Sequence, residues 1–84
     1  MILKEFNKYL ETKIAQNPKQ ITFTYYELRV KCDLSEDDML TSVRIAKQEL
    51  ENQGYKTYEP GASYFIGNQR MTVKENQLLI GIKE

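Results

Sequence analysis

Polar side chains at helical spacing are the best candidates in this sequence for a functional contact. On a helix predicted over residues 36–53, positions three and four residues apart share one face. Arg and Gln on such a face can pair with guanine and adenine in the major groove of DNA. The face comprises Asp37, Thr41, Arg44, Gln48 and Asn52. It is a candidate for base recognition, with the solvated face of an ordinary amphipathic helix as the alternative.

Both ends of this helix are marked in the sequence. Ser35 is a good N-cap, with Asp38 three residues later in an arrangement like a capping box. Gly54 stands where a helix C-terminus needs a positive φ. On the side opposite the polar face, the helical spacing of apolar residues predicts a stripe that packs on a core. The stripe comprises Met39, Val43, Ala46 and Leu50.

The first turn of the same helix is acidic, with Glu36, Asp37 and Asp38 in succession. Carboxylates stabilise a helix N-terminus because they complement its dipole. In helix-turn-helix docking, however, the N-terminal part of the recognition helix enters the groove, where carboxylates would face phosphates. These three residues are the main objection to DNA binding.

Length and charge limit the classes of function. The 84 residues are enough for one modest core, so we expect a single domain over residues 1–84. Twelve basic and twelve acidic residues give a net charge of zero. Nonspecific affinity for nucleic acid comes mostly from basic side chains that neutralise phosphates, so a net charge of zero disfavours nonspecific binding of nucleic acid. A local basic patch could still bind nucleic acid on a neutral protein.

No segment indicates a membrane or a secreted protein. The longest apolar runs, residues 64–66 and 78–80, are far shorter than the roughly 20 residues that span a bilayer. The N-terminus lacks a basic leader followed by an apolar stretch, and the single Cys32 cannot form an internal disulfide. We therefore expect a cytoplasmic protein.

Catalysis and metal binding find little support. The chain has no histidine, which is the commonest general base and metal ligand, and one cysteine without histidine excludes an ordinary zinc site. No glycine spacing resembles a phosphate-binding loop. Cys32 is most simply a small buried residue, with a reactive thiol as the alternative. We expect no enzymatic activity, no cofactor and no metal.

The rest of the chain predicts two more helices and several short strands. An apolar face predicts a helix over residues 2–16. Thr24 and Glu27 form a capping box that predicts a second helix, ending at about Cys32. Short β-prone runs bounded by turn signals predict strands near 21–24, 55–59, 62–66, 70–74 and 77–82, with a tight hairpin turn at 75–76.

The aromatic residues of the strand region interleave with small and polar residues. This pattern favours a core role for Tyr55, Tyr58, Tyr64 and Phe65. Tyr25 and Tyr26 are adjacent, so at least one should point away from the core. Exposed tyrosines would suit contact with a protein partner, because they supply large area at low entropy cost.

The element order and residues 35–66 resemble the winged helix-turn-helix superfamily. Residues 41–55 are similar to the third helix and following strand of GntR-type regulators, and residues 60–66 to their wing. The resemblance implies an α+β fold in which three helices pack on a small antiparallel sheet, and DNA binding in transcriptional regulation. Three features depart from the family: Lys47 in place of an apolar residue, the extra residues 36–39, and a segment after the wing.

The resemblance also implies a site and partners. Contacts to bases or phosphates of double-stranded DNA would come from Thr41, Ser42, Arg44 and Gln48, with Arg70 and Lys74 added from the wing. A homodimer would form through residues 2–16 or 77–82. The alternative is a protein-interaction module on the same scaffold, which binds another protein through its acidic helix start and exposed tyrosines and does not bind nucleic acid.

Overall fold

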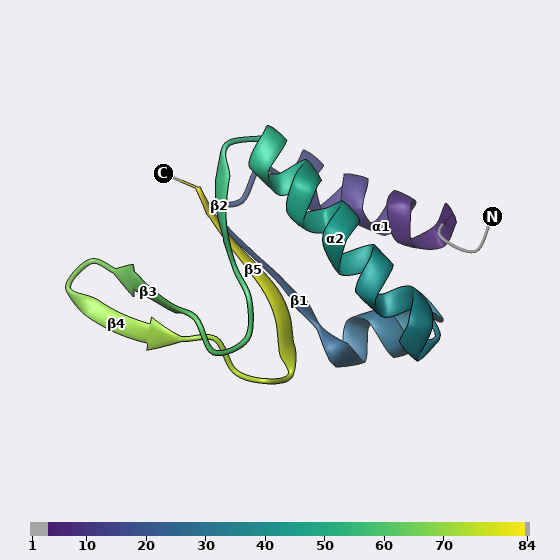
Figure 1. Cartoon of the computed structure of the whole chain (residues 1–84). Coiled ribbons are helices and arrows are strands. Elements are labelled where there is room, and N and C mark those ends of the chain that lie inside the picture. Colours follow the sequence, from purple (N-terminus) through teal and green to yellow (C-terminus); the bar gives the residue numbers. More distant parts are fainter. Residues whose placement is uncertain (1–3, 84) are drawn as a thin grey trace.

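The computed structural model describes residues 4–83. They form helices along one side, a small sheet and a projecting hairpin (Figure 1). The elements in chain order are α1 (Lys4–Ala15), β1 (Gln20–Thr24), the π-helical segment η1 (Glu27–Lys31), α2 (Glu36–Asn52), β2 (Tyr55–Tyr58), β3 (Ser63–Ile66), β4 (Gln69–Thr72) and β5 (Gln77–Lys83). The predicted α+β class with a small antiparallel sheet is therefore confirmed.

The main sheet has three antiparallel strands in the order β1-β5-β2. The last strand of the chain thus lies in the centre, between a strand that follows α1 and a strand that follows α2. β5 is buried on both sides: Leu79 and Ile80, on opposite faces, are each 0% exposed. A central strand covered on both faces needs this near-continuous apolar sequence.

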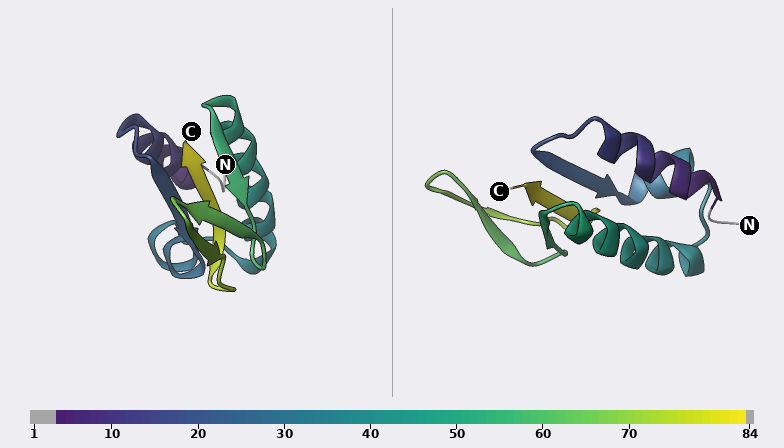
Figure 2. Two further views of the ribbon diagram at one scale, coloured as in Figure 1. Left: turned by 90° about the vertical axis from the view of Figure 1, so that its left-hand side faces the viewer. Right: turned by 90° about the horizontal axis from the view of Figure 1, so that it is seen from above.

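One face of the sheet is covered by the helices (Figure 2). Its core joins apolar side chains of α1, β1, η1, α2, β2 and β5. Gly81 lets α2 approach β5 closely, because a Cβ atom built there would lie 2.9 Å from Cδ1 of Leu50. The largest fully buried apolar residues of this core are Phe6, Phe23, Leu28, Leu34, Leu50 and Leu79.

A second, smaller cluster covers the opposite face of the sheet. There Tyr64 and Val73, at the base of the β3-β4 hairpin, pack with Ile80 of β5. Beyond this base the hairpin projects from the body of the molecule (Figure 1). Gly67, with φ of +61°, opens its two-residue turn, as the first position of a type II′ turn requires.

The long helix forms as the sequence predicts. α2 is continuous, the Ser35 side chain accepts from the Asp38 amide, and Gly54 has a φ of +92° after the helix ends. In the predicted apolar stripe Met39, Ala46 and Leu50 are buried, while Val43 is half-buried. Ser42 is the fourth buried residue of α2, so the buried face is rotated slightly from the predicted stripe.

The predicted second helix forms over residues 25–31, of which residues 27–31 are the π-helical segment η1. The Thr24 hydroxyl accepts from the Glu27 amide at 3.2 Å, as a capping box requires. The Glu27 carboxylate does not return to the Thr24 amide, however, because it binds Lys13 and Tyr9 of α1 instead. A helical segment thus lies where the sequence predicts the second helix, but it is short and mainly π-helical.

The strand positions are close to those predicted, but their pairing differs. Among residues 4–83, β3 pairs with β4 alone and β5 pairs with β1 and β2, so the turn at residues 75–76 does not join a hairpin. Both edges of β5 are occupied within the chain. A second copy could therefore pair with residues 77–82 only if β5 left one of these strands, and the predicted dimer contact stays a prediction.

Candidate nucleic-acid interface and neighbouring groove

The polar face of α2 points to solvent as predicted. Thr41, Arg44 and Gln48 are all exposed, as are Asp37 and Asn52. Gln48 donates to the Asn52 side chain at 3.1 Å. Arg44 makes no hydrogen bond or ion pair with another of residues 4–83, so its guanidinium is available to an external acceptor.

Ser42 does not belong to this surface. Its side chain is 0% exposed, and its hydroxyl donates to the Asp38 carbonyl at 2.8 Å. A residue one position after Thr41 lies about 100° further around the helix, which here turns it into the interior of the protein. The expectation that Ser42 contacts DNA is therefore wrong.

The acidic first turn is partly engaged within the protein. The Tyr25 hydroxyl donates to the Glu36 carboxylate, and this hydrogen bond raises the pKa of Tyr25. The Asp38 carboxylate accepts from the Ser35 hydroxyl at 3.0 Å. Asp37 is exposed, without a partner among residues 4–83. With five acidic and two basic side chains, α2 has a net charge of −3.

The two predicted contacts from the strand region lie on the hairpin and just after it. Arg70 in β4 is exposed, and its guanidinium donates to the Ser63 hydroxyl of β3 at 3.1 Å. Lys74 follows β4 and is also exposed. Both side chains are accessible to a ligand, but they lie outside α2 and add only two positive charges to the candidate interface.

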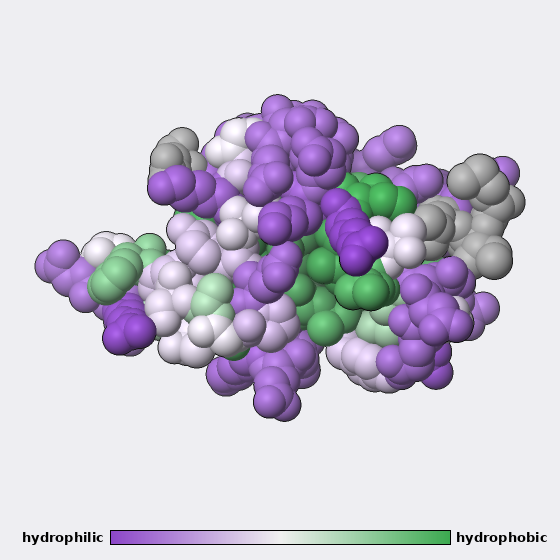
Figure 3. Space-filling view, viewed as in Figure 1, coloured by the Kyte–Doolittle hydropathy of each residue, from purple (hydrophilic) through white to green (hydrophobic). Residues whose placement is uncertain are grey.

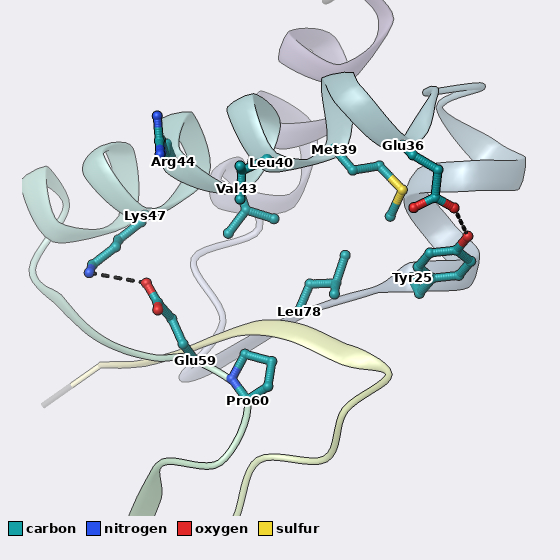
Figure 4. Close-up of a pocket in the computed structure, with 10 residues that line it drawn as sticks. All are labelled: Tyr25, Glu36, Met39, Leu40, Val43, Arg44, Lys47, Glu59, Pro60 and Leu78. Carbon is teal, nitrogen blue, oxygen red and sulfur yellow. Dashed lines mark hydrogen bonds and ion pairs between the residues drawn. The ribbon is translucent and has the colours of Figure 1, made fainter.

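A groove of about 500 Å³ runs between α2 and the start of the hairpin (Figure 4). Tyr25 with Glu36 lies at one end, and the Lys47–Glu59 ion pair, 3.2 Å long, lies at the other. An apolar surface occupies the middle of this face of the molecule (Figure 3). The apolar residues that line the groove are Met39, Leu40, Val43, Pro60 and Leu78.

Leu40 and Phe65 are exposed apolar residues that the sequence did not predict to lie on the surface. Leu40, beside Thr41, is 62% exposed on α2, which a plot of every residue around the helix would have revealed. Phe65 is 65% exposed, so its assignment to the core is wrong, while Tyr55 and Tyr64 are buried and Tyr58 is half-buried. Strand alternation explains the error, because Tyr64 points to the sheet and its neighbour points away.

Other reactive groups give no second site in the described residues. Cys32 is buried, and burial raises the pKa of its thiol, so it remains the protonated, less nucleophilic form. Within residues 4–83 no three carboxylate or thiol side chains are grouped to hold a metal ion. In the same part of the chain, no helix combines the length and apolar character needed to cross a membrane.

Comparison of the chain with models of protein families, with curated proteins and with solved structures finds no match. The assignment of a function therefore depends on the geometry of α2, the groove and the hairpin.

Proposed function

We propose that the chain is a winged helix-turn-helix domain that binds double-stranded DNA through α2 and the β3-β4 hairpin and acts in transcriptional control. The order of the elements supports the fold. A strand follows the first helix, two helical segments follow that strand, and the helix α2 leads into β2. In this proposal β5 is the strand that returns to the sheet and the β3-β4 hairpin is the wing, inserted between β2 and β5.

The observation that carries the DNA proposal is the exposure of Thr41, Arg44 and Gln48 on one face of α2. These are residue types that donate to base edges or phosphates. Arg44 sits near the middle of the helix without a partner among residues 4–83, so binding does not require it to break an internal ion pair.

The charge of α2 limits the affinity that this interface can have for a DNA duplex. A helix with a net charge of −3 is repelled by phosphates, and the positive charge must come from a few side chains. Glu36 and Asp38 already accept hydrogen bonds from Tyr25 and Ser35, which leaves Asp37 as the fully free carboxylate of the first turn. We therefore expect modest affinity with a shallow dependence on salt.

The test is binding of a fluorescent mixed-sequence duplex by anisotropy, over a salt series from about 20 to about 200 mM. With three or four cations at phosphates, log Kd should rise with log salt at a slope of about 2 to 4. No binding at the lowest salt would exclude the DNA proposal.

Protein binding is the second candidate function, and one observation favours it. Leu40 is 62% exposed beside an apolar groove, where a duplex offers little for it to contact. Exposed apolar surface next to a concave site is typical of protein docking. If no duplex binds at low salt, the groove and the tyrosines become the leading candidate surface.

A further inference from the structure

The strand edges of this protein are protected unequally. Exposed edges invite pairing with another chain, and proteins commonly guard them with charged residues. On β1, the Lys13 amine donates to the Thr22 carbonyl at 2.6 Å. β2 carries Lys56, and β4 carries Arg70. β3 has no charged residue, and its outer edge has no strand partner in the part of the chain that the structure describes.

The same strand exposes apolar side chains. Phe65 is 65% exposed and Ile66 is 49% exposed, although both lie in a regular strand. By strand alternation they point to opposite faces of the hairpin. A two-stranded ribbon is only marginally stable alone, and in the described part of the chain no further strand pairs with this hairpin.

We propose that two copies of the chain associate by antiparallel pairing of β3 with β3, which joins their hairpins into one four-stranded sheet. The partner is a second copy because an uncharged strand is compatible with itself across a two-fold axis. Pairing through β4 would instead bring two Arg70 side chains together. This interface does not depend on the proposed DNA binding.

The hairpin geometry also sets the register. The pair that flanks a two-residue turn, Ile66 with Gln69, is hydrogen-bonded, so the backbone groups of Ser63 and Phe65 point outward from β3. Pairing centred on Tyr64 places Ser63 opposite Phe65 of the second copy. Both outward backbone groups are then satisfied, and each Phe65 gains cover from the neighbouring chain.

The first test is the mass of the protein in solution by sedimentation equilibrium, from about 1 to about 300 µM. The proposal expects a reversible change from one chain to two. Phe65→Lys should weaken association by at least about ten-fold, because it places a charge in the new sheet. The matched control is Thr72→Lys, on the same face of the hairpin but on the outer edge of β4, and it should associate as the wild type does.

A second measurement needs no variant. In hydrogen exchange of the wild type, the amides of Ser63 and Phe65 should become protected as the protein concentration rises, while the outward amides of Arg70 and Thr72 should not. A protein that stays monomeric throughout the range overturns the proposal. Equal weakening by the two lysine substitutions, or protection of β4 in place of β3, overturns the β3 interface.

Discussion

The amine of Lys13 lies 2.6 Å from the Glu27 carboxylate and joins α1 to η1 by an ion pair that is largely shielded from solvent. The same amine donates to the Thr22 carbonyl of β1, and the Tyr9 hydroxyl donates to the same carboxylate. The Thr24 hydroxyl donates to the other carboxylate oxygen at 3.3 Å. One carboxylate thus links the first helix, the first strand and the segment that precedes α2.

Glu27→Gln should lower the free energy of unfolding by about 1–3 kcal/mol, because it leaves the amine of Lys13 partly buried without its counter-charge. Urea denaturation measures this change. Glu11→Gln, an exposed carboxylate on α1, is the control and should change stability by less than about 0.5 kcal/mol. Equal effects of the two substitutions would contradict a special role for Glu27.

The same carboxylate should make stability depend on pH. Burial opposes its charged form, but hydrogen bonds from Lys13 and Tyr9 outweigh burial and hold the pKa of Glu27 below its ordinary value. The unfolded chain therefore binds this proton more readily than the folded chain does. The resulting stability is present above the ordinary pKa of glutamate and is lost as pH falls through the lower folded pKa. The difference between wild type and Glu27→Gln should shrink over this acidic range, and a difference that stays constant would contradict the titration of Glu27 as its cause.

Gly81→Ala should destabilise the protein by about 1–3 kcal/mol, because the added methyl group overpacks the contact with Leu50 of α2. Thermal or urea unfolding measures the loss. Leu50→Ala removes the obstructing atom, so Gly81→Ala should cost clearly less in that background than in the wild type. Additive effects of the two substitutions would show that the close approach of β5 and α2 is not the reason for the glycine.

Arg44→Ala should weaken binding of the duplex without changing stability, since the side chain is exposed and has no partner among residues 4–83. The dependence of log Kd on log salt should fall by about one unit if Arg44 contacts a phosphate. Lys8→Ala, which removes an exposed cation from α1, is the control and should leave the slope unchanged. A loss of stability equal to the loss of binding would contradict an interfacial role for Arg44.

Asp37→Asn should strengthen binding of the duplex about two- to five-fold at low salt, because it removes a free carboxylate from the start of α2. Its expected cost in stability is about 0.3–1 kcal/mol, from the lost interaction with the helix dipole. Anisotropy titration and urea denaturation measure the two effects. Unchanged affinity would place the first turn of α2 away from the duplex and favour the protein-binding candidate.

Local interactions explain what was predictable from the sequence. The Ser35 cap and Gly54 mark the two ends of α2, and the helical period marks its faces, so every one of these signals lies within the helix or directly beside it in the sequence. The same period places Arg44 and Gln48 in solvent, because a side chain opposite an apolar stripe has no core to enter. The positions of β1 and β5 followed from short apolar runs between turn signals in the same way.

Contacts between distant residues decided the rest. Ser42 is buried and Leu40 exposed because the packing of α2 on the sheet sets the rotation of the helix, which the period alone leaves undefined by a fraction of a turn. The Glu27 carboxylate keeps a hydrogen bond from the Thr24 hydroxyl but does not bind the Thr24 amide, because Lys13, fourteen positions earlier in the chain, offers a charged partner. The central place of β5 depends on strands more than 20 residues away in the sequence. Strands pair through backbone hydrogen bonds, which nearly every residue can make, so the sequence does not indicate which strands will pair.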